Sequence, residues 1–146
     1  MIDRKWIGHE LTPSVLPIER SRLQFFAKAI GVTDPIYTDT AAARSAGYQD
    51  LPAPPTFLFA AELDSGASDR LLTELGIPIA RLLHGEQGFI YHRPACVGDT
   101  ITVRSRVDDV YVKKGGALEF VVRSARATNQ REELVAELRT VLVCRN

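Results

Sequence analysis

The sequence predicts an α+β domain in which helices come first and an antiparallel sheet follows. Apolar residues recur at helical spacing before about residue 80 and alternate with polar ones after it. A third observation is the apolar run from Phe57 to Ala61, which has no polar side and is typical of a helix buried on all its faces. The sheet therefore has to cover one very apolar helix.

Two helices are predicted before this run. Residues 16–31 place apolar side chains near helical spacing, and Gly31 is a natural C-terminal stop because glycine accepts the left-handed backbone that ends many helices. Residues 38–48 predict a short helix with Thr38 or Asp39 as its N-terminal cap.

The buried run belongs to a third helical segment, and a fourth follows it. Residues 51–66 contain three prolines before the run, which fit a helix entered through a stiff, extended approach. Residues 68–77 predict another short helix, with Ser68 as a plausible cap. The pattern of the sequence then changes from helices to strands.

Four segments after this point alternate apolar and polar residues with a period of two, which is typical of strands. In the second of them, Ile101 and Val103 fall on one face and Arg104 falls on the other. The stretches "KKGG" at 113–116 and "TNQRE" at 128–132 predict hairpin turns, so the strands should form an antiparallel meander. The four segments are residues 84–94, 99–112, 118–129 and 134–146.

The composition argues against several classes of protein. Lys plus Arg number 18 and Asp plus Glu number 18, and this zero net charge argues against nucleic acid or an anionic membrane surface as the main partner. Cys96 and Cys144 have no metal-ligand spacing, so a reduced pair is favoured over a disulfide and no metal site is expected. The N-terminus is too polar for a signal peptide, and no apolar run approaches the ~18 residues of a membrane span. We expect one cytoplasmic domain over residues 1–146.

Four motifs make the prediction more specific, because their order and spacing match a known superfamily over nearly the whole chain. The motifs are "GVTDPIYTD" at 31–39, "AGYQDLPAPPTF" at 46–57, "LLHGEQGFIYHRP" at 82–94 and "VGDTITVRSRV" at 97–107. With these motifs, the chain resembles the MaoC-like dehydratase/hydratase superfamily, in particular its fatty-acid-synthase-type N-terminal dehydratase branch. The resemblance implies a hot-dog fold, in which a long antiparallel sheet wraps around a central helix.

The resemblance also implies a chemistry. MaoC-like enzymes add water to a trans-2-enoyl thioester of CoA or acyl carrier protein, or remove it from a (3R)-hydroxyacyl thioester, with no further cofactor. Their acid/base pair is an Asp and a His in a loop G-D-x-N-P-x-H, which falls here on residues 31–37. Val32 stands at the Asp position and Tyr37 at the His position. Val32 carries no proton, and a phenol with a reference pKa of ~10 is poorly suited to act as a base at neutral pH.

Four other residues are weak candidates for a replacement acid or base. Asp34 and Asp39 are the carboxylates nearest to the loop, but Asp before proline is a common turn former and Asp39 fits a helix cap equally well. His84 and Glu86 could form a displaced acid/base pair, or they could lie half-exposed in a turn that enters the strand.

The start of the central helix departs from the family pattern as well. Catalytic members commonly have a His-Gly pair there, and the glycine N–H helps to bind the thioester carbonyl; the matching pair here is Pro55 and Thr56. Thr56 could still donate through its backbone N–H at a helix N-terminus, whereas proline has no N–H to donate. We therefore expect Tyr37, Pro55, Thr56 and Gln87 to contact the substrate.

Three functional hypotheses follow from the resemblance. The chain is most similar to the non-catalytic, substrate-binding subunit of two-subunit (3R)-hydroxyacyl-ACP dehydratases, and because it ends where a single hot-dog domain should end, we expect the catalytic half on another chain. The alternatives are a self-sufficient homodimeric hydratase with an atypical acid/base set and a non-enzymatic acyl-thioester binder. A thioesterase using Glu62 or Asp64 is more distant. A dimer is expected in each case, because a single hot-dog domain leaves one sheet edge open.

Overall fold

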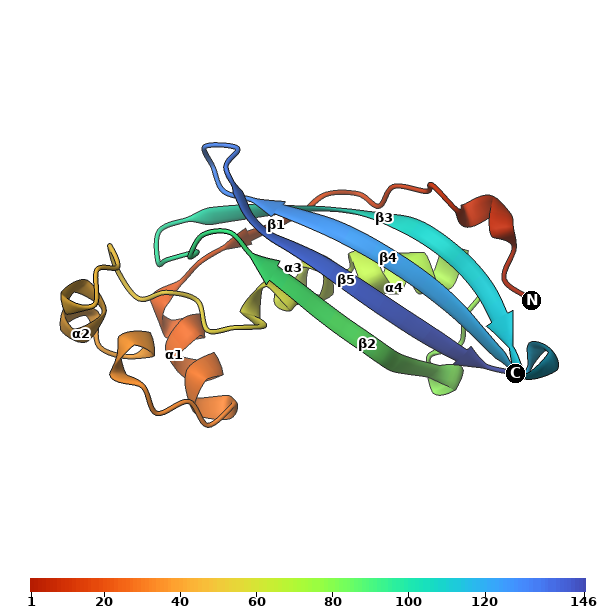
Figure 1. The fold of residues 1–146 in the computed structure, drawn as a ribbon, viewed down its shortest axis with the longest axis horizontal. Coiled ribbons are helices and arrows are strands. Elements are labelled where there is room, and N and C mark those ends of the chain that lie inside the picture. Colours follow the sequence, from red (N-terminus) through yellow and green to blue (C-terminus); the bar gives the residue numbers. More distant parts are fainter.

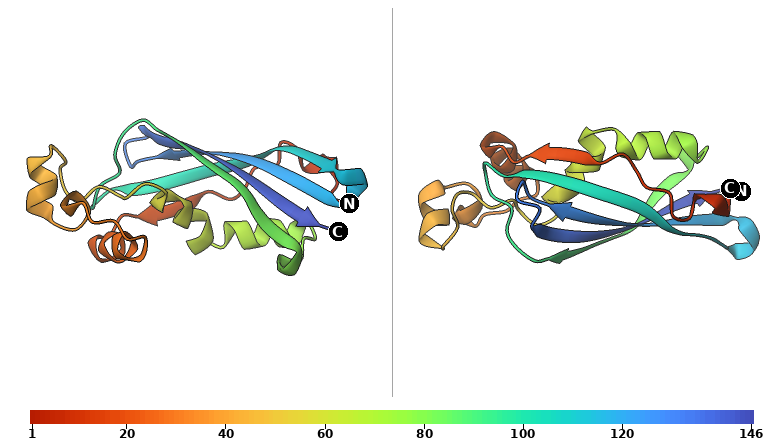
Figure 2. Two further views of the ribbon diagram at one scale, coloured as in Figure 1. Left: turned by 60° about the horizontal axis from the view of Figure 1, so that its bottom comes forward. Right: turned by 90° about the horizontal axis from the view of Figure 1, so that it is seen from above.

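The computed structural model describes residues 1–146 and confirms the α+β plan, with one curled antiparallel sheet and helices on one of its faces (Figure 1). Its sheet order is β1-β3-β4-β5-β2. The strands are β1 (Ser14–Pro17), β2 (Leu82–Tyr91), β3 (Thr100–Lys113), β4 (Leu118–Thr128) and β5 (Leu134–Arg145). The helices are α1 (Arg20–Ala29), α2 (Thr40–Ser45), α3 (Ala60–Asp64) and α4 (Ala67–Glu74). In Figure 2, α3 and α4 lie along the concave face, whereas α1 and α2 lie beyond one end of the sheet.

The first predicted helix starts later than its apolar spacing suggested. The helix over 16–31 is wrong in its first part, because Leu16 and Pro17 belong to β1 and pair with Ile101 and Thr100 of β3. Proline has no N–H to donate, but it is tolerated in an edge strand such as β1. The rest of the predicted helix is confirmed as α1.

Two predicted helix caps have different outcomes. Asp39 caps α2, since its carboxylate accepts a 2.7 Å hydrogen bond from the N–H of Ala41. The predicted cap of α4 is wrong, because Ser68 already lies inside that helix and its hydroxyl makes no hydrogen bond. The hydroxyl of Ser65 accepts a 3.2 Å hydrogen bond from the N–H of Ala67 in its place.

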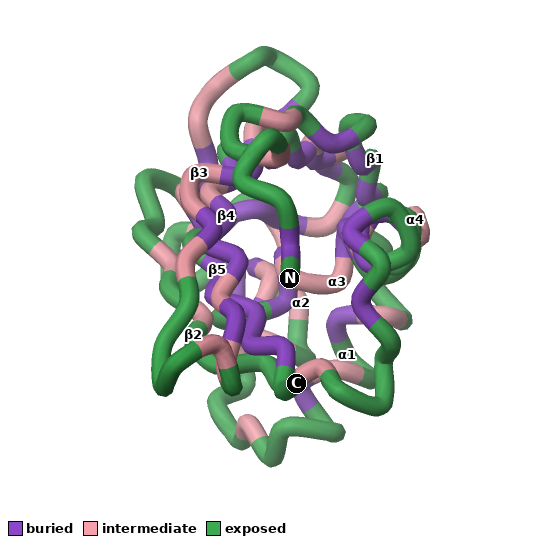
Figure 3. Tube along the Cα trace, turned by 90° about the vertical axis from the view of Figure 1, so that its right-hand side faces the viewer, coloured by how far each residue is buried: buried purple, intermediate pink, exposed green.

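The buried central helix is confirmed, although it is short. Phe57–Phe59 form a 3-10 turn that runs directly into α3, and Phe57, Leu58 and Ala61 are all buried. Together with residues of α1 and the sheet they form the larger of two main core clusters, while α4 covers the other. Figure 3 shows that buried backbone lines the space between the strands and these helices.

The predicted alternation is confirmed in the first half of β3, but not in β2, which is mostly exposed, nor in β5, where residues 140–144 are buried on both faces. Ile101 and Val103 are buried against the helices, whereas Arg104 is exposed on the outer, convex face. A bulge between Val107 and Asp109 shifts the pairing of β3 with β4. Both predicted hairpin turns are present, and they connect β3 to β4 and β4 to β5.

Strand β2 is the feature of the sheet that matters most for the site. It pairs with β5 along one edge and leaves its other edge free, at the end of the strand order opposite to β1. Leu83, Ile90 and Tyr91 of this strand are exposed. An open edge with exposed apolar side chains is suited to pairing with a strand of another chain.

The remaining structural expectations concern cysteines, metals and membranes. Cys96 and Cys144 are both free and buried, and burial raises the pKa of the Cys96 thiol. No three His, Cys, Asp or Glu side chains lie together as metal ligands would. None of the helices has the length and apolar character needed to cross a bilayer.

Candidate functional site

The loop that follows α1 presents an apolar residue and a phenol where the resemblance places the acid and base. Gly31 ends the helix in the left-handed region, with φ +71°. Val32 and Tyr37 are both half-buried, and Tyr37 ends a short 3-10 turn. Burial, followed by the neighbouring Tyr48, raises the pKa of Tyr37 above its ordinary value of 10.0. The phenol is therefore neutral near pH 7, where it can form hydrogen bonds but cannot serve as a base.

The two nearby aspartates are engaged as caps. A carboxylate oxygen of Asp34 accepts a 3.0 Å hydrogen bond from the N–H of Ile36 and so opens the 3-10 turn. Asp39 caps α2, as described above. Both side chains are exposed on the surface of the loop. The turn and cap roles that were alternatives to catalysis are thus confirmed for both residues.

His84 and Glu86 do not form a pair. Both lie inside β2, as the predicted strand over 84–94 implied, so the alternative of a turn entering the strand is wrong. A bulge between them puts them on opposite faces of the sheet. The His84 ring meets the Phe59 ring edge-on, with centroids 5.1 Å apart, on the helix-covered face. Glu86 forms an ion pair with Arg139 of β5, with 2.7 Å between nitrogen and oxygen. His84 therefore has no carboxylate partner to orient it.

The backbone at the start of the central helix is strained, and its N–H is already bound. Thr56 has φ +76°, a left-handed conformation that is rare for a β-branched residue. Its N–H donates a 2.8 Å hydrogen bond to the hydroxyl of Tyr91, at the end of β2. The backbone N–H of Thr56, which we expected to be available for a thioester carbonyl, is therefore already bound to a side chain of the same protein.

Two grooves flank this hydrogen bond. The tyrosine groove, of about 330 Å³, is lined by Tyr37, Tyr48 and Tyr91 together with Pro55 and Arg93. The phenylalanine groove, of about 390 Å³, is more apolar and opens beside β2. Because Tyr91 lines the first groove and Thr56 the second, their hydrogen bond separates the two. The phenylalanine groove is lined by Phe26, Phe57, Phe59 and Phe89, with Thr56, His84 and Gln87 as its polar members.

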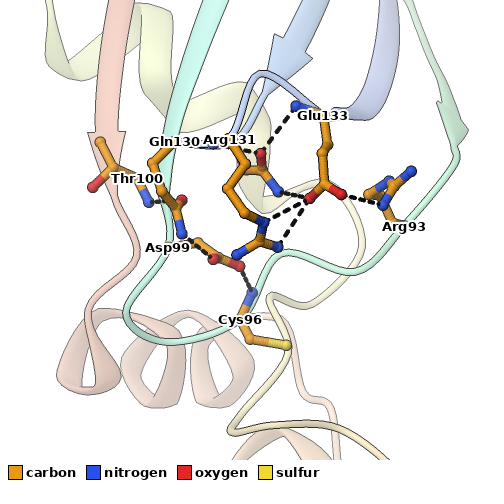
Figure 4. A network of polar contacts seen from close by, with 8 residues as sticks. Arg93, Cys96, Asp99, Thr100, Gln130, Arg131 and Glu133 are labelled. Carbon is orange, nitrogen blue, oxygen red and sulfur yellow. Dashed lines mark hydrogen bonds and ion pairs between the residues drawn. The ribbon is translucent and has the colours of Figure 1, made fainter.

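A network of ion pairs lies next to the tyrosine groove (Figure 4). Arg93 follows β2 and donates to Glu133, at 2.9 Å, while Arg131 binds the other carboxylate oxygen of Glu133. A 2.7 Å hydrogen bond from Asn129, supported by the charge of Arg131, lowers the pKa of Glu133. The network fixes the turn between β4 and β5 against the loop that carries Arg93.

The structure brings together all four predicted substrate contacts, because they flank one hydrogen bond. Tyr37 and Pro55 line the tyrosine groove, and Thr56 and Gln87 line the phenylalanine groove. The sequence reasoning missed Tyr91, whose contact with Thr56 spans 35 residues. Its place in a quoted motif, next to a predicted strand, was the one signal that could have drawn attention to it.

Comparison with known proteins identifies the family. The family model for the FAS1-like, dehydratase domain region matches residues 5–138. A UPF0336 protein of Saccharopolyspora erythraea is 35% identical over 147 residues, covering 99% of this chain and 92% of that protein. In the HadBC (3R-hydroxyacyl-ACP dehydratase) complex from Mycobacterium tuberculosis, one chain has a TM-score of 0.82 at 26% identity, covering 94% of this chain and 96% of that one.

A more distant similarity points to the same fold. A chain of the ChsH1-ChsH2 complex from Mycobacterium tuberculosis has a TM-score of 0.72 at 22% identity, with coverage of 93% and 84%. The family match spans most of the sequence and agrees with the curled sheet and the buried central helix. The chain therefore belongs to the FAS1-like dehydratase-region family, and its fold is the hot-dog fold of the MaoC-like dehydratases.

Proposed function

We propose that this chain is the substrate-binding, non-catalytic subunit of a two-subunit (3R)-hydroxyacyl-thioester dehydratase or enoyl-thioester hydratase. One observation carries the proposal: the positions that the resemblance assigns to the acid and base hold Val32 and Tyr37. The family supports hydratase or dehydratase chemistry for the assembled enzyme. The acid and base would then come from a partner chain.

The reaction needs a group that takes a proton and a group that gives one. Val32 can do neither, and burial keeps Tyr37 protonated. Asp34 and Asp39 accept hydrogen bonds from backbone N–H groups, and Glu86 is paired with Arg139. His84 remains, but a single imidazole without an orienting partner is a poor substitute for an acid/base pair.

The hydrogen-bond donors that a thioester carbonyl would need also support the proposal. An enolate-like transition state needs hydrogen-bond donors that are free to face the developing charge. Here the N–H of Thr56 donates to Tyr91, so a thioester carbonyl would have to displace a hydrogen bond that the chain already makes. Hydrogen-bond donors on the partner subunit could bind the carbonyl without displacing this hydrogen bond.

The contribution of this chain would be the phenylalanine groove. Its four aromatic side chains are suited to an acyl chain, and it lies beside the free edge of β2. A partner that paired with β2 would cover the groove and leave the acyl chain between the two subunits. Two proteins with this fold are named as complexes of two different chains, HadBC and ChsH1-ChsH2, which supports a heteromeric assembly here. The thioester would arrive on CoA or on the phosphopantetheine of acyl carrier protein.

The distant thioesterase alternative gains no support from its candidate residues. Glu62 is buried beneath the sheet and bonded to Ser105 and Arg123. Asp64 is paired with Arg22 of α1, with 2.6 Å between nitrogen and oxygen. Neither carboxylate is available to activate a water molecule.

An activity assay tests the proposal directly. The purified chain is incubated with crotonyl-CoA and a longer enoyl-CoA, and loss of the enoyl absorbance is followed with and without a MaoC-like partner that carries the Asp/His loop. We expect no turnover from the chain alone and turnover when the partner is added. Replacing the Asp of the partner's loop with Asn should abolish the activity of the mixture. Turnover by the chain alone at an ordinary enzymatic rate would overturn the proposal.

A further inference from the structure

A buried ion pair connects the central helix to the sheet. Glu62 of α3 meets Arg123 of β4, with 3.1 Å between Oε2 and Nη2, and their side chains are only 10% and 4% exposed. The hydroxyl of Ser105 on β3 donates to the other carboxylate oxygen, Oε1. Both oxygens of Glu62 therefore have partners.

The guanidinium of Arg123 is only partly satisfied. Its Nε and Nη1 atoms are buried and have no hydrogen-bond partner in the protein. Burying a donor of a charged group without an acceptor is costly, and a buried ion pair is no more stabilising than well-packed apolar side chains. The three unpaired N–H groups on these two atoms therefore indicate an acceptor that the chain itself does not supply.

A small cavity lies beside these free groups. Its volume is about 10 Å³, which is room for one atom the size of a water oxygen. Phe59 lines both this cavity and the phenylalanine groove. Thr140 lines the cavity and donates a 2.8 Å hydrogen bond to Gln87, which lines the groove. The cavity thus adjoins the groove, and the Phe59 ring stands between them.

The free groups limit what the cavity can bind. Both are donors, so the atom that occupies the cavity has to be an acceptor. Glu62 already balances the charge of Arg123, and a carboxylate on the ligand would add an uncompensated negative charge in a buried place. A neutral oxygen, such as a hydroxyl or keto oxygen, fits both conditions.

We propose that Arg123 binds a hydroxyl or keto oxygen carried on the acyl chain at a distance from the thioester. The subunit would then select oxygen-bearing acyl thioesters over plain alkyl ones of the same length. Phe59 is partly exposed and contacts His84 only edge-on. Its ring can therefore turn to let the acyl chain of the ligand reach the cavity. This inference rests on the proposed function, because it assumes that the groove holds the acyl chain.

A binding experiment tests this inference. Matched acyl-CoA pairs with and without a terminal hydroxyl, from hexanoyl to dodecanoyl, are titrated into the chain and into its assembled complex by isothermal titration calorimetry. At one chain length we expect the hydroxylated member to bind at least about tenfold more tightly, because its oxygen accepts from an otherwise unpaired donor of a charged group.

Two variants show whether Arg123 causes the preference. The double variant Glu62→Met, Arg123→Met removes both charges, leaves neither unpaired, and should bind both members of a pair equally well. Arg123→Lys keeps a charge for Glu62, but all its N–H groups sit on one nitrogen held by that ion pair and none sits at the Nε and Nη1 positions, so the preference should fall too. The second variant still gives a result if the first fails to fold.

The outcomes separate this inference from the proposed function. Equal binding of the two members at every chain length would overturn the role of Arg123, and would mean that a permanent water occupies the cavity. Failure of every acyl thioester to bind, on CoA and on the phosphopantetheine of acyl carrier protein alike, to the chain and to the complex, would instead overturn the proposed function.

Discussion

Replacing Thr56 with glycine is expected to stabilise the protein. Thr56 has φ +76°, and a left-handed backbone costs a residue with a Cβ about 1–2 kcal/mol, which glycine does not incur. The greater freedom of glycine in the unfolded chain offsets roughly 0.5–1 kcal/mol of this gain. The Thr56 side chain makes no capping hydrogen bond, so little else is lost. The net change in the free energy of unfolding is about 0.5–1 kcal/mol in favour of the variant.

Thermal unfolding measures this change. For a domain near this size the melting temperature should rise by about 1–4 °C. Thr38→Gly is the matched control, because Thr38 has φ −131° and gains nothing from glycine there, so this variant should melt below the wild type. If Thr56→Gly melts at or below the temperature of the Thr38→Gly control, the strain that we assign to Thr56 is not present.

Three further predictions follow from the site and the sheet edge. Tyr91→Phe should free the N–H of Thr56 and speed its hydrogen exchange, yet leave the isolated chain inactive; activity appearing in this variant would contradict the proposed division of labour. The pKa of Glu133 is lowered from 4.5, so its contribution to stability is present above about pH 4.5 and is lost as the pH falls through the folded-state pKa. The wild type should therefore have a higher melting temperature than Glu133→Gln at neutral pH, and this difference should disappear at acidic pH. Ile90→Lys, at an exposed position of the free β2 edge, should prevent dimerisation in a sizing experiment, whereas Ile79→Lys, even more exposed but outside the strand, should not.

Most of the fold could be predicted from the sequence, because periodicity and burial constrain how the strands and the central helix pack. The period-two alternation in the second half sets which side of each strand faces the core, and the apolar run from Phe57 to Ala61 can be stable only when covered. The short strand β1 was missed because four residues ending in Pro17 carry almost no periodic signal. Ser68 was misread because a hydroxyl at the second helical position looks like a cap from sequence alone.

The site was predictable only in part. The positions that the resemblance assigns to the acid and base hold Val32 and Tyr37, and this can be read from the sequence alone once the motif is placed. The hydrogen bond from Thr56 to Tyr91 depends on how far β2 extends past the start of the central helix, which no local pattern fixes. The case of Arg123 is different. The alternation of β4 already places it on the buried face with Val121, and a charge at an inward position was a signal that could have been used.

The two ends of the central helix differ in how their polar groups are satisfied, and this difference is the strongest structural support for a binding role without catalysis. At the first end, the N–H of Thr56 could bind a thioester carbonyl, but Tyr91 satisfies it within the chain. Further along, beneath Glu62, the Nε and Nη1 atoms of Arg123 keep three buried N–H groups that nothing in the chain satisfies. An unmet buried donor is costly, so these groups call for an acceptor from outside the chain, either a water molecule or a ligand. Under our proposal, a chain that has closed its carbonyl donor and left open a donor beside the phenylalanine groove recognises the acyl part of a substrate while another subunit acts on the thioester.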